Sequence, residues 1–127
     1  LEGVTPLVQM TGDVSTANNG GFIQIRRDVA DLTAKNISGV YLTVKGNGEK
    51  YFVHIRTKWT VLPWQYYQAA FDTSDQWRET RLSIGEFKGS SWLLPKNISG
   101  QDIRSIGIVA FGRDHVADIS VRAVGFF

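Results

Sequence analysis

The residue types that most often perform acid–base chemistry are scarce in this chain. It contains two histidines, His54 and His115, and no cysteine. Asp114 directly precedes His115, so this pair comes nearest to an acid–base dyad. General acid–base catalysis needs side chains that converge in a pocket, and adjacent loop residues seldom point the same way. We therefore interpret residues 113–115 as a turn, with a hydrolase that uses the pair as an alternative hypothesis.

Other motifs with catalytic or cofactor chemistry are absent from the sequence. Gly46-Asn47-Gly48 is typical of a turn, because the spacing and the helix of a phosphate-binding loop do not follow it. No nucleophile elbow occurs, and the two histidines lack the spacing of zinc ligands. We predict no catalytic residues, no metal and no cofactor. Asp72 and Asp75 indicate a turn, and a structural calcium held by such a loop stays open.

The most informative stretch is residues 57–68, because it is rich in aromatic side chains. Tyr67 is in register with Ala69 and Phe71, which predicts that Tyr67 belongs to the core. Trp64, Tyr66 and Gln68 then point to the opposite face of the strand.

A hairpin with the preceding strand would place His54 and Arg56 beside these residues. Aromatic planes with fixed polar partners suit a protein hot spot or a small-ligand cleft. The predicted partner- or ligand-binding residues are His54, Arg56, Trp59, Trp64, Tyr66 and Gln68. The alternative is that Trp59 and Trp64 cap the core while His54 and Arg56 are solvated. Trp92 lies in the predicted loop 85–102 and is expected to cover the same or the opposite end.

The elements that must position these residues are short strands. Apolar and polar residues alternate with a period of two along most of the chain, and turn-forming residues separate the runs. Strands are expected at residues 7–11, 22–27, 40–45, 51–56, 66–71, 77–84, 105–111 and 119–127. Residues 112–118 are expected to form a loop, with short helical turns near residues 84–88 and 99–102. The pattern predicts an all-β jelly-roll β-sandwich of about eight strands, as a single domain over residues 1–127.

Composition excludes several functional classes. The chain has 127 residues, 43% of them hydrophobic, which is typical of a folded globular domain. Its net charge is +2 and no basic run exceeds Arg26–Arg27, so we expect no nucleic-acid partner. No apolar run approaches the ~20 residues of a membrane span. The lack of cysteine agrees with an intracellular, reducing compartment, either a bacterial cytoplasm or a mitochondrial-type one.

Three stretches carry a family resemblance. They are NNGGFIQIRRDVADL (residues 18–32), YFVHIRTKWTVLPWQYYQAAFDT (51–73) and RSIGIVAFGRDHVADISVRAVGFF (104–127). In this order they resemble the complex I intermediate-associated protein 30 family, in particular its bacterial members. The resemblance implies a galactose-binding-like jelly roll and a role like that of the assembly factors for respiratory complex I. It supplies no catalytic residues.

The sequence departs from the family pattern at its start. Family members begin with an aspartate- and glycine-rich segment, and nothing like it precedes Val4. We therefore expect that the full-length protein has a further N-terminal segment. The resulting hypothesis is a non-enzymatic, chaperone-like domain that recognises a protein partner, with a carbohydrate or other small ligand as the alternative.

Overall fold

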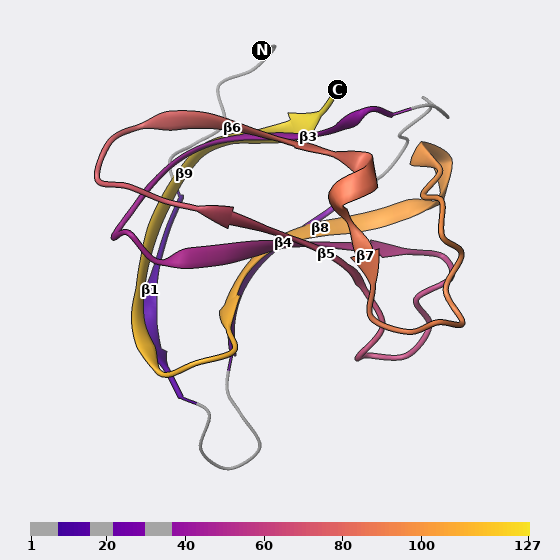
Figure 1. The fold of residues 1–127 in the computed structure, drawn as a ribbon, viewed down its shortest axis with the longest axis horizontal. Helices are drawn as coiled ribbons and strands as arrows, with labels where there is room; N and C mark the ends of the chain where they lie inside the picture. Colours follow the sequence, from indigo (N-terminus) through magenta and orange to yellow (C-terminus); the bar gives the residue numbers. More distant parts are fainter. Residues whose placement is uncertain (1–7, 16–21, 30–36) are drawn as a thin grey trace.

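The protein folds as two antiparallel β-sheets packed face to face (Figure 1). The computed structural model describes residues 8–15, 22–29 and 37–127. One sheet has the strand order β1-β9-β3-β6 and the other has the order β2-β8-β4-β5-β7. The strands are β1 (Val8–Val14), β2 (Phe22–Asp28), β3 (Gly39–Gly46), β4 (Lys50–Thr57), β5 (Tyr67–Asp72), β6 (Arg78–Ser83), β7 (Lys88–Gly89), β8 (Ile103–Phe111) and β9 (His115–Phe126).

The core lies between the two sheets and follows the alternation in the sequence. In β4, Tyr51, Val53 and Ile55 are fully buried, whereas the residues between them are only partly buried. In the facing sheet, Leu42 of β3 and Ile119 of β9 are buried in the same cluster. β4 and β5 contribute every second side chain to this layer, and burial of a large aliphatic side chain stabilises the fold by about 1.5–3 kcal/mol.

The eight strands predicted from the sequence are confirmed, and the structure adds a ninth. The extra strand, β7, has two residues and pairs with the start of β5, so no alternation pattern could reveal it. The two helical turns are also confirmed, as 3₁₀ helices at Ile84–Glu86 and Gly100–Asp102. Leu7, where the first strand was expected to begin, lies outside the described residues.

One expected loop is wrong in its second half. Residues 112–118 were predicted to form a loop, but β9 begins at His115, and residues 115–118 pair with β1. The turn therefore occupies only the three residues after Phe111, where Gly112 adopts a positive φ of 98°. Glycine tolerates this left-handed conformation, which lets the chain reverse tightly. No helix in the described part of the chain is long and apolar enough to cross a membrane.

Candidate binding groove

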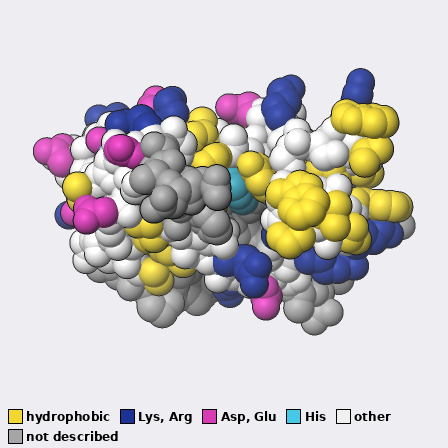
Figure 2. All heavy atoms as spheres, turned by 90° about the horizontal axis from the view of Figure 1, so that it is seen from below, with side chains coloured by type: hydrophobic (Ala, Val, Ile, Leu, Met, Phe, Trp, Pro, Cys, Tyr) yellow, Lys and Arg dark blue, Asp and Glu magenta, His cyan; other side chains and the backbone are white. Residues whose placement is uncertain are grey.

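The outer face of the five-stranded sheet carries a groove of about 730 Å³. Its floor comes from β8, its two sides come from β2 and β4, and the segment between β4 and β5 closes one end. The groove is lined by Gln24, Arg26, His54, Arg56, Val61, Pro63, Trp64, Tyr66, Ser105, Gly107, Val109 and Phe111. In the view from below, hydrophobic side chains gather at one end of the molecule (Figure 2).

Small residues on β8 create the hollow. Gly107 lies opposite His54 on one side and Arg26 on the other, and Ser105 lies opposite Arg56. The larger side chains of the two neighbouring strands therefore flank positions that carry little or no side chain. A Cβ atom at Gly107 would lie 3.2 Å from the main-chain oxygen of Ile25, so glycine also suits the tight packing here.

Arg56 fixes the segment that closes the groove. Its Nη1 donates hydrogen bonds to the main-chain oxygens of Pro63 (3.0 Å) and Gln65 (2.9 Å). Its Nη2 donates to those of Thr60 (2.8 Å) and Leu62 (3.2 Å). A guanidinium group presents its donors in one rigid plane, so these four bonds hold the chain in a ring around the side chain. Arg56 thus acts on the loop from the groove wall.

Buried polar side chains fix the same loop from within. Thr60 is buried, and its hydroxyl donates to the main-chain oxygen of Thr57 over 2.8 Å. Gln65 is also buried, and its side-chain oxygen accepts a 3.0 Å hydrogen bond from the Leu62 N–H. Residues 58–66 form no helix or strand, yet these polar groups have defined hydrogen-bond partners. The loop is therefore a rigid platform for the side chains that it exposes.

His54 and Tyr66 form a stacked pair in the groove. Their ring centroids are 4.0 Å apart with an interplanar angle of 9°. His54 Nε2 lies 2.8 Å from Gln68 Oε1, which can only accept, so this bond places a proton on Nε2. Burial lowers the pKa of His54; the Gln68 bond opposes this shift and the charge of Arg56 adds to it. His54 is therefore neutral near pH 7, and its polar edge is fixed by Gln68.

The structure brings together four of the six predicted site residues. His54, Arg56, Trp64 and Tyr66 all line the groove, with Trp64 and Tyr66 in the loop before β5. Gln68 pairs with His54 across β4 and β5 and supports it from outside the lining.

Trp59 lies outside the groove lining. Its Nε1 donates to Asp102 Oδ2 over 3.3 Å, and Lys58 Nζ lies 5.0 Å from the ring centroid. Trp59 is nevertheless half exposed, at 50%.

The alternative that Trp59 and Trp64 cap the core is wrong, because their side chains are 50% and 65% exposed. The separate expectation that Trp92 covers an end of the sandwich is also wrong, because Trp92 is 90% exposed. The sequence also gave no sign of Gln24 and Arg26, which line the far side of the groove. Their strand, β2, pairs with β8, which lies about eighty residues further along the chain. Alternation indicates which face a residue occupies but not which distant strand is its neighbour.

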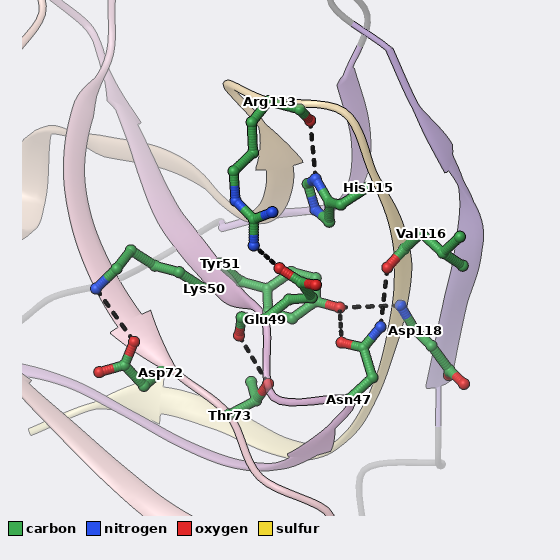
Figure 3. A network of polar contacts seen from close by, with 10 residues as sticks. All are labelled: Asn47, Glu49, Lys50, Tyr51, Asp72, Thr73, Arg113, His115, Val116 and Asp118. Carbon is green, nitrogen blue, oxygen red and sulfur yellow. Dashed lines mark hydrogen bonds and ion pairs between the residues drawn. The ribbon is translucent and has the colours of Figure 1, made fainter.

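The acid–base alternative at residues 114 and 115 finds no support in the turn geometry (Figure 3). Nδ1 of His115 lies 2.8 Å from the main-chain oxygen of Arg113, a contact that orients the imidazole within the turn. Nε2 of His115 is buried without a hydrogen-bond partner among the described residues. A general base needs a nitrogen that a substrate can reach.

Polar contacts near His115 connect the turn between β3 and β4 with the start of β9. Tyr51 is fully buried, and its hydroxyl donates to Asn47 Oδ1 (2.7 Å) and accepts from the Asp118 N–H (2.9 Å). Arg113 forms an ion pair with Glu49 across the same region (Figure 3). Asp72, which raised the question of a calcium loop, pairs with Lys50 at 3.1 Å. Within the described ranges, no three histidine or acidic residues gather as metal ligands.

Comparison with known proteins identifies the family. A sequence profile described as complex I intermediate-associated protein 30 matches residues 3–120. The chain belongs to this family. The resemblance noted in the sequence is thereby confirmed over nearly the whole chain. No curated protein sequence is significantly similar to this one.

Two similar solved structures come from Clostridium thermocellum. The family 11 carbohydrate-binding module of the cellulosomal cellulase Lic26A-Cel5E matches with a TM-score of 0.69 and 10% identity, over 99% of this chain and 89% of that one. The family 11 module in complex with a β-1,3-1,4-mixed-linked tetrasaccharide matches with a TM-score of 0.67 and 11% identity, over 99% and 91%. At this identity the match shows the fold, and it confirms the predicted jelly-roll sandwich.

Replacing Arg56 by methionine should release the loop. Methionine keeps an apolar stem but cannot donate to the four main-chain oxygens, so we expect the free energy of unfolding to fall by about 2 kcal/mol. Urea denaturation followed by tryptophan fluorescence measures this change. Arg26→Met is the matched control, because Arg26 is an exposed arginine of the same groove, and it should shift stability by less than about 0.5 kcal/mol. Equal effects of the two substitutions would contradict the role assigned to Arg56.

The lowered pKa of His54 predicts a pH dependence of stability. Below about 6.5, the ordinary pKa of histidine, the unfolded chain takes up a proton that the folded protein resists until its own lower pKa is reached. The free energy of unfolding therefore falls through this window as the pH falls. His54→Gln cannot titrate, so thermal unfolding of the two proteins should show the wild type losing stability relative to the variant on acidification. Parallel pH profiles would refute the assignment.

Proposed function

We propose that this domain binds a protein partner without performing chemistry, and that the partner is an intermediate in the assembly of respiratory complex I. The observation that carries the proposal is a groove whose closing loop is held by hydrogen bonds from Arg56, with exposed aromatic side chains at its end. Trp64 is 65% exposed although its loop is held in place by Arg56. Membership of the family supports the choice of partner, since the family is described by its association with a complex I intermediate.

The physical basis of the proposal is preorganisation. Binding a partner costs less free energy when the contact residues are already ordered in the free protein. Tyr66 is held by its stack on His54, and its N–H donates to the Ser90 hydroxyl over 3.0 Å. Tryptophan, tyrosine and arginine are the residues most enriched among protein hot spots. The proposed contact residues are Trp64, Tyr66, His54 and Trp59, with Arg56 and Gln68 positioning them.

Crosslinking from position 64 tests the proposal. A photoreactive benzoylphenylalanine in place of Trp64 should crosslink, in cells of the source organism, to a subunit or assembly intermediate of complex I. The matched control places the same group at Glu79, an exposed residue of β6 in the other sheet. Adding Tyr66→Ala should lower the yield, because truncating a hot-spot residue costs about 2 kcal/mol or more. Equal products from positions 64 and 79, or products without a complex I subunit, would count against the proposal.

Carbohydrate binding in the same groove is the second candidate. The groove combines aromatic rings with the amide of Gln24 and the hydroxyl of Ser105, which suits an extended polar ligand. The two solved carbohydrate-binding modules share this fold, which makes sugars a reasonable class to test.

Titration with the β-1,3-1,4-mixed-linked tetrasaccharide, and then with other glucans, separates the two candidates. If the groove binds sugars, tryptophan fluorescence should change in a saturable way, and Trp64→Ala should abolish the change. Trp92→Ser is the control, because Trp92 does not line the groove. No change with any glucan in the wild type would remove this candidate.

A further inference from the structure

Two loops beside the groove project apolar side chains into solvent. Trp92 is 90% exposed and the adjacent Leu93 is 67% exposed. On the neighbouring loop, Val61 is 77% exposed and Leu62 is 40% exposed. We call these four residues the apolar tip. Figure 2 shows hydrophobic side chains gathered at one end of the molecule, with basic side chains next to them. Single exposed apolar residues are common on protein surfaces, but a group of this size marks an interaction site.

The two loops are joined by hydrogen bonds, so the exposure of the tip is built into the backbone. The Ser90 N–H donates to the Tyr66 main-chain oxygen over 2.8 Å, and the Ser90 hydroxyl donates to that of Trp64 over 2.9 Å. Leu94 is buried and anchors the second loop to the core. The Leu94 N–H also donates to the Ser91 oxygen over 3.1 Å, which closes a turn. Trp92 and Leu93 therefore lie at the top of an anchored turn.

The net positive charge of the chain, +2, falls in the same segments. Residues 57–66 and 84–104 hold four of the fourteen basic residues, Lys58, Lys88, Lys96 and Arg104, and two of the twelve acidic residues, Glu86 and Asp102. The remainder of the chain carries equal numbers of basic and acidic residues.

Both carboxylates near the tip already have partners. Asp102 pairs with Lys58 at 3.3 Å and accepts from Trp59 Nε1. Glu86 accepts from the Ser83 N–H over 2.8 Å. Lys88 and Lys96 are exposed and have no ion pair among the described residues. The segments that carry the tip therefore hold basic as well as exposed apolar side chains, in agreement with the basic groups beside the hydrophobic end in Figure 2.

We propose that the apolar tip lies against the surface of a lipid bilayer that contains anionic lipids, with Trp92 and Leu93 in the interfacial layer. Tryptophan favours the membrane–water interface, where its ring is buried and its N–H stays hydrated. Lys88 and Lys96 would then face the anionic headgroups, which attract basic side chains. Projecting apolar side chains with basic residues in the same segments suit contact with a membrane surface better than insertion into a pocket of another protein.

This contact is peripheral and does not depend on the proposed function of the groove. The tip lies on loops between the strands. Gln24, Arg26 and the groove floor come from strands, whereas the tip comes from loops at one end of them and shares only Val61 with the groove lining. A domain bound in this way could hold its groove beside the membrane surface.

Vesicle binding tests the proposal with the full chain. Co-sedimentation and tryptophan fluorescence are measured with vesicles of phosphatidylcholine alone and of phosphatidylcholine mixed with phosphatidylglycerol. The wild type should bind the mixed vesicles more strongly, with a blue shift of its fluorescence. Trp92→Ser combined with Leu93→Ser should lower the partition coefficient by about tenfold or more. Both residues are exposed, so this variant should fold as the wild type does.

Charge and position controls complete the experiment. Lys88→Gln and Lys96→Gln should each weaken binding to the mixed vesicles by about fivefold, and should leave binding to phosphatidylcholine unchanged. Val116→Ser removes another exposed apolar residue outside the tip and should have no effect. The proposal is overturned if the wild type does not bind the mixed vesicles, or if the Trp92 and Leu93 variant binds them equally well. Self-association that depends on Trp92, without vesicle binding, would instead assign the tip to a second copy of the chain.

Discussion

Arg56 lies near the end of β4, and its side chain donates four hydrogen bonds to main-chain oxygens of the loop that follows this strand. The loop would otherwise be a surface connection without regular structure, and such connections are normally mobile. One guanidinium group accounts for the hydrogen bonds of four main-chain carbonyl groups. The loop is therefore held by a side chain and not by backbone hydrogen bonds between paired strands. The orientations of Trp64 and Tyr66, and the closed end of the groove, depend on this contact.

The residues in and around the groove are of two kinds: some form hydrogen bonds within the protein, and others expose aromatic side chains to solvent. Arg56, Gln68, Thr60 and Gln65 form hydrogen bonds that fix the surrounding chain, so their polar groups are largely used within the protein. The exposed aromatic side chains beside them form few hydrogen bonds within the protein and can contact a bound partner. Ser105 and Gly107 on the floor keep the space between β2 and β4 open. Rigid support under exposed aromatic groups is the arrangement that lowers the entropic cost of binding.

Alternation in the sequence was enough to predict the strands and to indicate which side chains of β4 and β5 point away from the core. It placed Tyr67 in the core and His54 beside Gln68, because a hairpin pairs neighbouring segments. It could not predict that β2 and β8 complete the groove, since their pairing joins distant segments. Alternation also could not predict the hydrogen-bond acceptors of Arg56. A basic residue near aromatic residues does not indicate which main-chain carbonyl groups of a loop will face it. The exposure of Trp92 follows from the anchoring of its loop through Ser90 and Leu94, which no local pattern reveals.

Residues 58–66 form a rigid platform in the free protein, held by Arg56. Backbone order parameters from ¹⁵N NMR relaxation measure this directly, because rigid backbone gives values of about 0.85 and flexible backbone gives values below about 0.6. We expect the order parameters of the Thr60 and Gln65 amides to match those of β4 and β5 in the wild type and to fall in Arg56→Met. Low values throughout the loop in the wild type, or values unchanged in the variant, would contradict it.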